Sequence, residues 1–489
     1  MLNLSRRQFL KSAALFSAAA GCGCNTTYVS SKSFPNIIFI MADDMGYGDP
    51  GCYNPESKTP TPNIDRFAQQ GLQFTHAHSP GTLCVPARYG LLTGRYPFRE
   101  EMSKHRIAPL IEPERMTIAS VLKKNGYRTA CIGKWHLGFH NISDPDYDQP
   151  LRGGPVDLGF DTFFGMHASL DIPPYYYIEN DQVVQAPTDS IKASHTGWVT
   201  PVQGKFWRQG KIAPDFDHDN VLPDFADKAI SFIQQQDENH PFFLYLALAA
   251  PHTPWLPSEK FEGTSEAGLY GDFIHMVDFY VGKVLQELEK QGLADNSLVI
   301  FTSDNGPVWY EHDIEKYGHD STTFLKGMKA DAYEGGHRMP FIARWPGHIK
   351  PATCTDEVIS FTDMLATFAA IVDEELPENA GEDSYNILPV LLGQDYDKPL
   401  RQATVIEDRA IIQWPWKLIL GSGYGNLHVR YSEKLQAEKR AEENIGGGLF
   451  NLQDDPLETR NLYDQHPEKV KRLTRLLESY RSRGYSVMR

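Results

Sequence analysis

The stretch Asn36-Ile37-Ile38-Phe39-Ile40-Met41-Ala42-Asp43-Asp44 joins a continuous apolar run to two adjacent carboxylates. A run without polar alternation is typical of a parallel strand that is buried on both faces of a sheet. The abrupt change at Asp43-Asp44 marks the carboxyl end of that strand. The stretch therefore predicts a buried strand that ends in charged side chains.

Three later apolar runs repeat this pattern and alternate with helical segments. We expect strands over residues 128–132, 242–249 and 298–302, with a further extended segment over 340–344. We expect helices from Thr61-Pro62 to Gly71, and over residues 116–124, 223–236 and 272–291. Residues 142–207 have no clear period and are expected to form long loops. This alternation predicts an α/β fold with a large, mostly parallel central sheet flanked by helices.

Polar residues stand at the end of each of the four buried strands. Asp43-Asp44 follows the first, Lys134 and His136 the second, His252 the third and Asp304-Asn305 the fourth. Ligands of wound α/β sheets bind outside the carboxyl ends of the strands. We therefore expect these four sets of side chains to meet in one crevice.

The pattern changes near residue 372. Short expected strands (403–406, 416–420 and 449–452) alternate with turns, and a last helix over 467–481 carries Val470, Leu473, Leu476 and Leu477 on one face. We expect residues 34–371 to form the main domain and 372–489 a small α+β C-terminal subdomain.

The first 33 residues are expected to lie outside the fold. Ser5-Arg6-Arg7-Gln8-Phe9-Leu10-Lys11 resembles a bacterial twin-arginine export signal, and the apolar stretch behind it is too short to span a bilayer. The alternative is a basic, disordered start. Cleavage could follow Ala20, or Ala19-Ala20-Gly21-Cys22 could be a degenerate lipobox that makes Cys22 a lipid anchor. Residues 25–33 would then be a polar tether, and the mature protein would be periplasmic or at the cell surface.

Composition narrows the class of protein. The 489 residues are 41% hydrophobic and 22% charged, and the net charge is −16. Such an acidic chain is a poor candidate for general nucleic-acid binding, and any site for an anionic substrate must be locally positive. The six cysteines show neither zinc-site spacing nor a disulfide framework.

The segment Cys84-Val85-Pro86-Ala87-Arg88-Tyr89-Gly90-Leu91-Leu92-Thr93-Gly94-Arg95 places a cysteine at the start of an expected helix. Free backbone N–H groups and the positive end of the helix dipole favour an anion beside Cys84. Taken alone, the residue is better explained as a buried thiol at a helix start.

Asp43, Asp44, Asp304 and Asn305 offer only oxygen ligands, which select calcium or magnesium over zinc. Viewed separately, Asp43-Asp44 could be a cap and Asp304-Asn305-Gly306 a plain turn. Their shared position at the ends of buried strands favours a metal site, because charge placed there needs a partner.

Six motifs in order resemble those of the type I, formylglycine-dependent sulfatases of the alkaline phosphatase superfamily. They are Asp43 to Asp49, Cys84 to Arg95, Gly133-Lys134-Trp135-His136-Leu137-Gly138, Pro251-His252-Thr253-Pro254, Ser303-Asp304-Asn305-Gly306, and Lys329 with Tyr333-Glu334-Gly335-Gly336. The segment from Leu449 to Leu462 resembles the C-terminal subdomain of that family, so the likeness covers nearly the whole mature chain.

This resemblance implies a role for each matched residue. A formylglycine-generating enzyme would oxidise Cys84 to Cα-formylglycine, whose hydrate attacks sulfur and is transiently sulfated. Calcium, or magnesium in its place, would be bound by Asp43, Asp44, residue 84, Asp304 and Asn305. Arg88 would steady the hydrate, and His136 would assist the loss of sulfate. Lys134 and Lys329 would hold the sulfate oxygens, and His252, helped by Lys329, would protonate the leaving group.

Each of these roles has a plainer alternative. Lys134 could be a solvated strand end, His252 a satisfied histidine in a proline turn and Lys329 a surface lysine. Val85 and Ala87 stand where the family commonly has small hydroxyl residues, which bears on the efficiency of oxidation and not on the mechanism.

The resemblance implies a sulfated polysaccharide or oligosaccharide as substrate. The stretch from Met166 to Tyr177, together with Trp198 and Trp207-Arg208, is a candidate for the lining of the pocket mouth, where aromatic rings would suit stacking on sugar faces. The alternative is that these loop residues pack on the domain. Two other functions stay open: a phosphate or phosphonate ester hydrolase of the same fold, and an inactive relative that only binds sulfated glycans.

Overall fold

The computed structural model describes residues 34–142, 145–196, 200, 202–396 and 399–487. The predicted export signal, the lipobox at Cys22 and Trp198 lie outside the described residues. Within them, residues from Phe34 onward form one compact unit. The predicted boundary near residue 372 stays a prediction.

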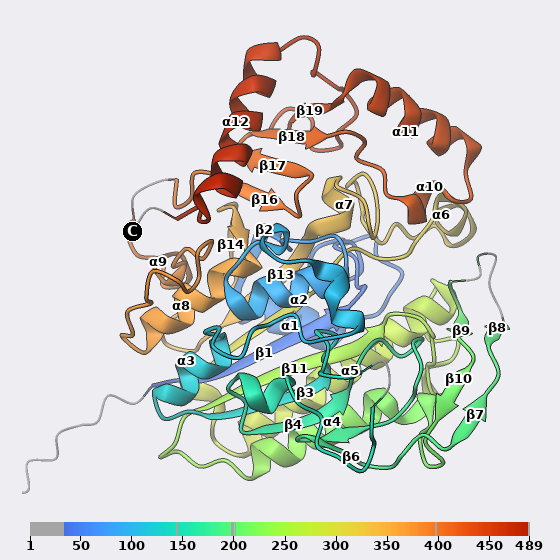
Figure 1. Ribbon diagram of the computed structural model, residues 1–489, viewed down its shortest axis with the longest axis vertical. Helices are drawn as coiled ribbons and strands as arrows, with labels where there is room; N and C mark the ends of the chain where they lie inside the picture. Colours follow the sequence, from blue (N-terminus) through green and yellow to red (C-terminus); the bar gives the residue numbers. More distant parts are fainter. Residues whose placement is uncertain (1–33, 143–144, 197–199, 201, 397–398, 488–489) are drawn as a thin grey trace, which may run out of the picture. The chain divides into compact units, whose positions relative to one another are not determined.

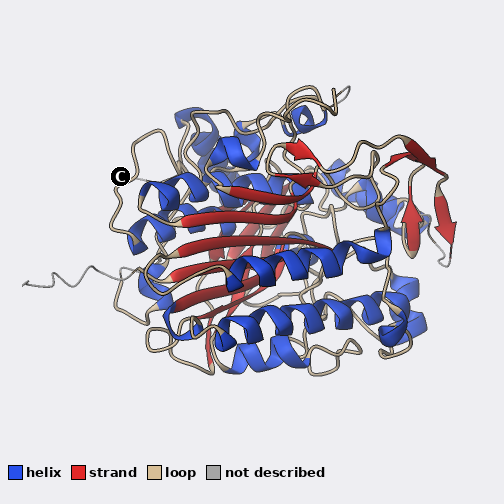
Figure 2. Cartoon of the chain, turned by 90° about the horizontal axis from the view of Figure 1, so that it is seen from below, coloured by secondary structure: helices blue, strands red, loops and turns tan. Residues whose placement is uncertain are grey.

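A large mixed sheet forms the centre of this unit, with helices on both of its faces (Figures 1 and 2). Five neighbouring strands in the order β12-β1-β11-β3-β4 run parallel. β13 is antiparallel to β12 and β2, and short strands extend both edges. The strands of this sheet are β1 (Asn36–Asp43), β2 (Leu72–His78), β3 (Arg128–Lys134), β4 (Thr162–Met166), β5 (Ile178–Glu179), β6 (Gln182–Val183), β11 (Phe242–Pro251), β12 (Ser297–Ser303), β13 (Arg338–Arg344), β14 (Thr353–Thr355) and β15 (Ile359–Ser360).

The first strand lies in the middle of the parallel set, between β11 and β12. Ile37 to Met41 are at most 1% exposed, because helices cover both faces of the sheet. Burying each such side chain contributes about 1.5–3 kcal/mol. The helices are α1 (Pro62–Gln69), α2 (Cys84–Thr93), α3 (Ile118–Lys124), α4 (Val221–Gln234), α5 (Gly268–Lys290), α6 (Glu311–Tyr317), α7 (Glu334–His337), α8 (Met364–Ile371), α9 (Leu388–Leu391), α10 (Asn426–Val429), α11 (Glu433–Ile445) and α12 (Pro467–Arg483). The α/β fold class is confirmed.

The C-terminal part contains a separate antiparallel sheet of four strands, with α12 beside it (Figure 1). The strands are β16 (Thr404–Ile406), β17 (Ala410–Gln413), β18 (Trp416–Leu420) and β19 (Gly447–Asn451). Leu473, Leu477 and Tyr480 of α12 are buried in the cluster under this sheet, while Val470 and Leu476 are partly buried against it. Three strands and α12 were expected from the sequence; β17 and α11 were not.

One expectation about local structure was wrong, and the strand β2 was missed. Residues 142–207 are not only loops: β4 joins the parallel set, and β7 (Asp189–Ile191), β8 (Ser194–Thr196) and β9 (Lys205–Trp207) pair locally, β7 with β10 (Gly210–Ile212). β2 was missed because its alternating burial gives no continuous apolar run. Thr61 is the N-cap residue of α1 and Pro62 its first residue, as expected, although the Thr61 hydroxyl donates to Asp65 and makes no capping bond.

None of the helices in the described part of the chain has the length and apolar character needed to cross a membrane.

Candidate active site

The carboxyl ends of the central strands bring the predicted polar residues together. Asp43 ends β1, Lys134 ends β3, and His252 and Asp304 follow β11 and β12 directly. The Lys134 Nζ donates to Asp43 Oδ2 at 2.6 Å, and His252 Nε2 lies 3.7 Å from Asp44 Oδ2. The parallel register of these strands therefore creates one crevice, as their order in the sequence predicts.

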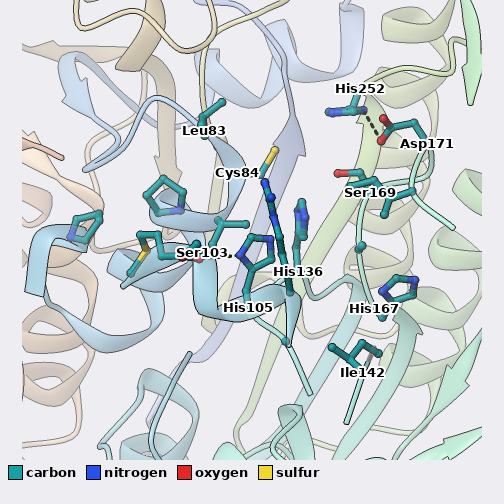
Figure 3. A pocket seen from close by; sticks show the side chains of 18 of the residues that line it. Leu83, Cys84, Ser103, His105, His136, Ile142, His167, Ser169, Asp171 and His252 are labelled. Carbon is teal, nitrogen blue, oxygen red and sulfur yellow. Dashed lines mark hydrogen bonds and ion pairs between the residues drawn. The ribbon is translucent and has the colours of Figure 1, made fainter. Parts of the chain in front are cut away.

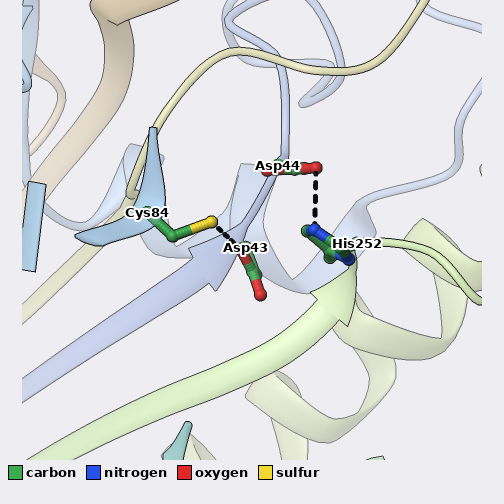
Figure 4. A group of neighbouring side chains, drawn as sticks. All are labelled: Asp43, Asp44, Cys84 and His252. Carbon is green, nitrogen blue, oxygen red and sulfur yellow. Dashed lines mark hydrogen bonds and ion pairs between the residues drawn. The ribbon is translucent and has the colours of Figure 1, made fainter. Parts of the chain in front are cut away.

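Cys84 is the first residue of α2 and faces the end of β1 (Figure 4). Its Sγ lies 3.3 Å from Asp43 Oδ1 and 3.6 Å from Lys329 Nζ, and the residue is 5% exposed. Burial, and then the charge of Asp43, raise the pKa of the thiol well above its usual value. The unmodified thiol therefore stays protonated at neutral pH and is a poor nucleophile.

Three buried carboxylates face three buried cations around Cys84. Lys329 Nζ donates to both oxygens of Asp44 at 2.5 and 2.7 Å. Arg88 donates to Asp304 Oδ2 through Nε at 3.1 Å and Nη2 at 2.8 Å, and its Nη1 donates to the carbonyl of Lys134 at 3.1 Å. Burial raises the pKa of Asp43, but Lys134 and the other nearby cations outweigh burial and hold that pKa well below its usual value.

The oxygen-rich part of the site suits a hard cation. Asp43, Asp44, Cys84 and His252 each place one donor atom within 4.8 Å of the others. Asn305 donates through Nδ2 to Asp44 Oδ1 at 2.7 Å, while its buried Oδ1 has no hydrogen-bond partner in the described part of the chain. An acceptor without a donor beside three carboxylates fits a calcium or magnesium ligand set, so the residues present fit the predicted ion.

Two histidines complete the predicted set. His136 is buried, has φ +59°, and its Nδ1 has no partner among the described residues. His252 Nδ1 lies 2.6 Å from the carbonyl of Thr253. Burial, reinforced by Lys329, lowers the pKa of His252 to about 4. A left-handed backbone at a non-glycine residue such as His136 persists only where its surroundings hold it.

A cavity of about 1100 Å³ opens above these residues and is lined by Cys84, His136, His252 and Lys329 (Figure 3). One wall comes from the segment singled out in the sequence, including His167, Ser169, Asp171 and Arg208. The Asp171 carboxylate pairs with Arg208, and its Oδ1 lies 4.0 Å from His252 Nδ1.

Among the described residues, the rings of Tyr175, Tyr176, Tyr177 and Trp207 do not line this cavity, although His167 and Arg208 do. Tyr176 packs on His167 with ring centroids 5.4 Å apart, and Trp207 stacks on His218 at 4.9 Å. The alternative, that these aromatic residues pack on the domain, describes them correctly.

Two walls of the cavity were not expected from the sequence. One comes from Phe98, Glu100, Met102, Ser103, His105 and Arg106, and the other from Glu407 and Asp408. No periodicity or motif marks these residues, because their position depends on tertiary packing.

Comparison with known proteins agrees with this geometry. Residues 35–374 match the Sulfatase family, and residues 328–483 match the family described as N-sulphoglucosamine sulphohydrolase, C-terminal. The chain thus belongs to the type I sulfatases of the alkaline phosphatase superfamily. It is a sulfuric ester hydrolase.

Similar proteins include two curated relatives and a solved structure. An N-acetylgalactosamine-6-O-sulfatase of Bacteroides thetaiotaomicron is 35% identical, with 92% of this chain and 93% of that protein covered. The human N-acetylgalactosamine-6-sulfatase is 34% identical, covering 75% and 67%. A sulfatase structure from work on glycosaminoglycan metabolism by Bacteroides thetaiotaomicron has a TM-score of 0.80 at 34% identity, covering 91% and 99%.

Proposed function

We propose that this protein hydrolyses the 6-O-sulfate ester of N-acetylgalactosamine residues in a sulfated glycan. The observation that carries the proposal is the position of Cys84, at a helix start between Asp43 and Lys329 on the floor of the cavity. The names of the two curated relatives support this sugar and this position. A cavity of about 1100 Å³ has room for a sugar ring and its neighbours.

Two groups that the family typically uses would be added to these side chains. Formylglycine, made from Cys84 by a formylglycine-generating enzyme, supplies the hydrated aldehyde that attacks sulfur. Calcium, or magnesium in its place, held by Asp43, Asp44, Asp304, Asn305 and residue 84, supplies positive charge for the sulfuryl oxygens.

The chain's own cations would bind and orient the sulfate group. Lys329 lines the cavity beside Cys84, and Lys134 is buried against Asp43; both would donate to sulfate oxygens. Preorganised donors of this kind stabilise the charge that develops in the transition state. Arg88 is fixed by Asp304 and holds that carboxylate in place beside residue 84.

The two histidines would move protons. His252 lies at the cavity wall, where its Nε2 can give a proton to the oxygen of the leaving alcohol, with Lys329 nearby. The negative charge of a bound sulfate ester would raise the pKa of His252 from about 4 and favour the protonated form that this step needs. His136 lines the same cavity as Cys84, and its buried Nδ1 has no partner among the residues that the structure describes, so it is suited to accept a proton as sulfate is lost.

Purified protein tests the proposed substrate directly. Release of free sulfate is measured from 6-sulfated and 4-sulfated N-acetylgalactosamine, from 6-sulfated N-acetylglucosamine, and release of phosphate from an aryl phosphate. We expect the first compound to give the highest kcat/KM and the Cys84→Ala variant to give none. Preference for the gluco sugar or for the 4-sulfate would contradict the proposed sugar. Faster release of phosphate would favour the phosphatase alternative, and binding without release would favour an inactive relative.

We also propose export by the twin-arginine route, supported by Ser5-Arg6-Arg7-Gln8-Phe9-Leu10-Lys11. This route carries folded proteins, so residue 84 could be oxidised in the cytoplasm before export. Replacing Arg6 and Arg7 by lysine should retain the protein in the cytoplasm. Unchanged periplasmic yield would contradict this route, and labelling of Cys22 with a lipid precursor would show the anchor.

A further inference from the structure

One turn of the C-terminal sheet reaches the segment just before Cys84 and the loop that carries Lys329. Residues 407–409 join β16 to β17, and Glu407 and Asp408 line the cavity. The Glu407 backbone N–H donates to the carbonyl of Pro80 at 2.8 Å. The turn therefore touches the segment that leads into α2.

The Glu407 carboxylate binds the residue that stands two positions before Cys84. Its Oε1 accepts from the Thr82 backbone N–H at 3.0 Å and from the Thr82 hydroxyl at 2.7 Å. Thr82 is fully buried and cannot reach water. Its backbone N–H and its hydroxyl therefore depend on the Glu407 carboxylate for hydrogen bonds. The start of α2 is thus fixed from the C-terminal sheet.

The Arg409 guanidinium extends the same contact to the second loop. Nη2 donates to the carbonyl of Ala330 at 3.1 Å and to the Thr82 hydroxyl at 3.3 Å, while Nε pairs with Glu407 Oε2 at 3.1 Å. The Ala330 backbone N–H donates in turn to the carbonyl of Thr82 at 2.9 Å. Ala330 follows Lys329 directly and has φ +74°, a conformation that needs such support.

From these contacts we propose that Glu407 and Arg409 are positioning residues for the sulfatase reaction. They form a clasp (Glu407, Arg409, Thr82 and Ala330) that sets the position of residue 84 relative to Lys329. Both side chains are partly exposed, so their ion pair alone is weak. Their hydrogen bonds to the segments around Thr82 and Ala330 fix the positions of these segments. A small displacement of reacting groups lowers the reaction rate strongly. This inference rests on the proposed function.

The Arg409→Ala variant tests the clasp, with Arg115→Ala as the matched control. Arg115 also joins a carboxylate to a backbone carbonyl, at 2.8 Å from Glu382 Oε1 and 2.9 Å from the Asn379 oxygen, and neither partner belongs to the site. We expect Arg409→Ala to lower kcat by about 10- to 100-fold with little change in KM. Arg115→Ala should keep the wild-type kcat.

A second pair of variants separates positioning from simple loss of packing. Glu407→Gln keeps an oxygen that can accept from Thr82 and should retain most of the activity, whereas Glu407→Ala should behave like Arg409→Ala. A rise in KM with unchanged kcat would instead make Glu407 a substrate contact and overturn the proposal. Equal losses in Arg409→Ala and Arg115→Ala would overturn it too.

Amide hydrogen exchange gives a readout that does not depend on activity. The backbone N–H groups of Thr82 and Ala330 should exchange about 10-fold faster in Arg409→Ala and at the wild-type rate in Arg115→Ala. Unchanged exchange in Arg409→Ala would contradict the clasp. If the wild-type protein released no sulfate, the proposed function would fail, and exchange would still decide whether Arg409 holds the two loops.

Discussion

The oxygen of the leaving group must receive a proton, because a sugar alkoxide cannot depart without one. His252 is the residue of the cavity wall that lies beside both Lys329 and Asp44. We predict that His252→Gln lowers kcat on a sugar sulfate by about 10²- to 10⁴-fold, and much less on an aryl sulfate, whose phenoxide leaves unaided.

A histidine outside the site provides the control for this prediction. His275 lies half-buried on α5 and contacts the Thr264 hydroxyl at 2.8 Å. His275→Gln should keep the wild-type kcat on both substrates. Equal losses on sugar and aryl sulfates in His252→Gln would show that His252 acts on something other than the leaving group.

The sequence predicts which residues meet at the site, but it does not predict the hydrogen bonds and ion pairs between them. The positions of Cys84, Lys134 and Asp304 follow from strand order and motif, since charge at the end of a buried strand needs a partner. The sequence does not show that Arg88 binds Asp304, or that His136 has a left-handed backbone. Those details depend on contacts between segments far apart in the chain.

Among the elements of the fold, β1 and β12 carry the residues of the proposed cation site at their carboxyl ends. They bring Asp43, Asp44 and Asp304 together, and Asn305 adds an oxygen that has no donor. We predict that a chelator abolishes sulfate release and lowers the thermal unfolding midpoint, and that calcium restores both. An ion at 100 times its Kd stabilises a fold by about 2.7 kcal/mol.

An isosteric change identifies the site responsible for that response. Asn305→Leu removes the free oxygen without changing charge and should weaken the calcium response in thermal unfolding. A full response in Asn305→Leu, or no response to the chelator in the wild type, would count against this cation site.

The helices and strands that were predicted correctly are those with a clear pattern of apolar residues in their own sequence. The buried strands β1, β11 and β12 read as apolar runs, and α12 shows its apolar face. β4 was missed although it joins the parallel set, because its five residues lie in a segment without a period. The turn at 407–409 gives no local signal, since only the packing of two sheets brings it to the cavity.

At the scale of the whole molecule, buried charges connect the catalytic loops to the C-terminal part. His428 of α10 contacts Asp331 at 2.5 Å and Glu311 at 3.2 Å. Burial lowers the pKa of His428, but hydrogen bonds and charge from Asp331 and Glu311 outweigh burial and raise it to about 9. Asp331 stands two residues after Lys329, so this contact supports the same loop.

The sign of the resulting pH effect follows from linkage. A raised pKa in the folded state gives a stabilisation that is complete below the unfolded value of about 6.5 and is lost as pH rises through about 9. We predict that the free energy of unfolding falls by about 1–3 kcal/mol between pH 6.5 and pH 9 because of His428. In His428→Gln this contribution should be absent. Identical pH profiles for both proteins would contradict the assignment to His428.

The central claim is that residue 84 acts as formylglycine, and one measurement tests it most directly. Preparations with different degrees of oxidation are compared by peptide mass spectrometry across Cys84, and their rate of sulfate release from 6-sulfated N-acetylgalactosamine is plotted against the aldehyde fraction. We expect a proportional line through zero. Sulfate release at full rate from chains that keep the Cys84 thiol would contradict it.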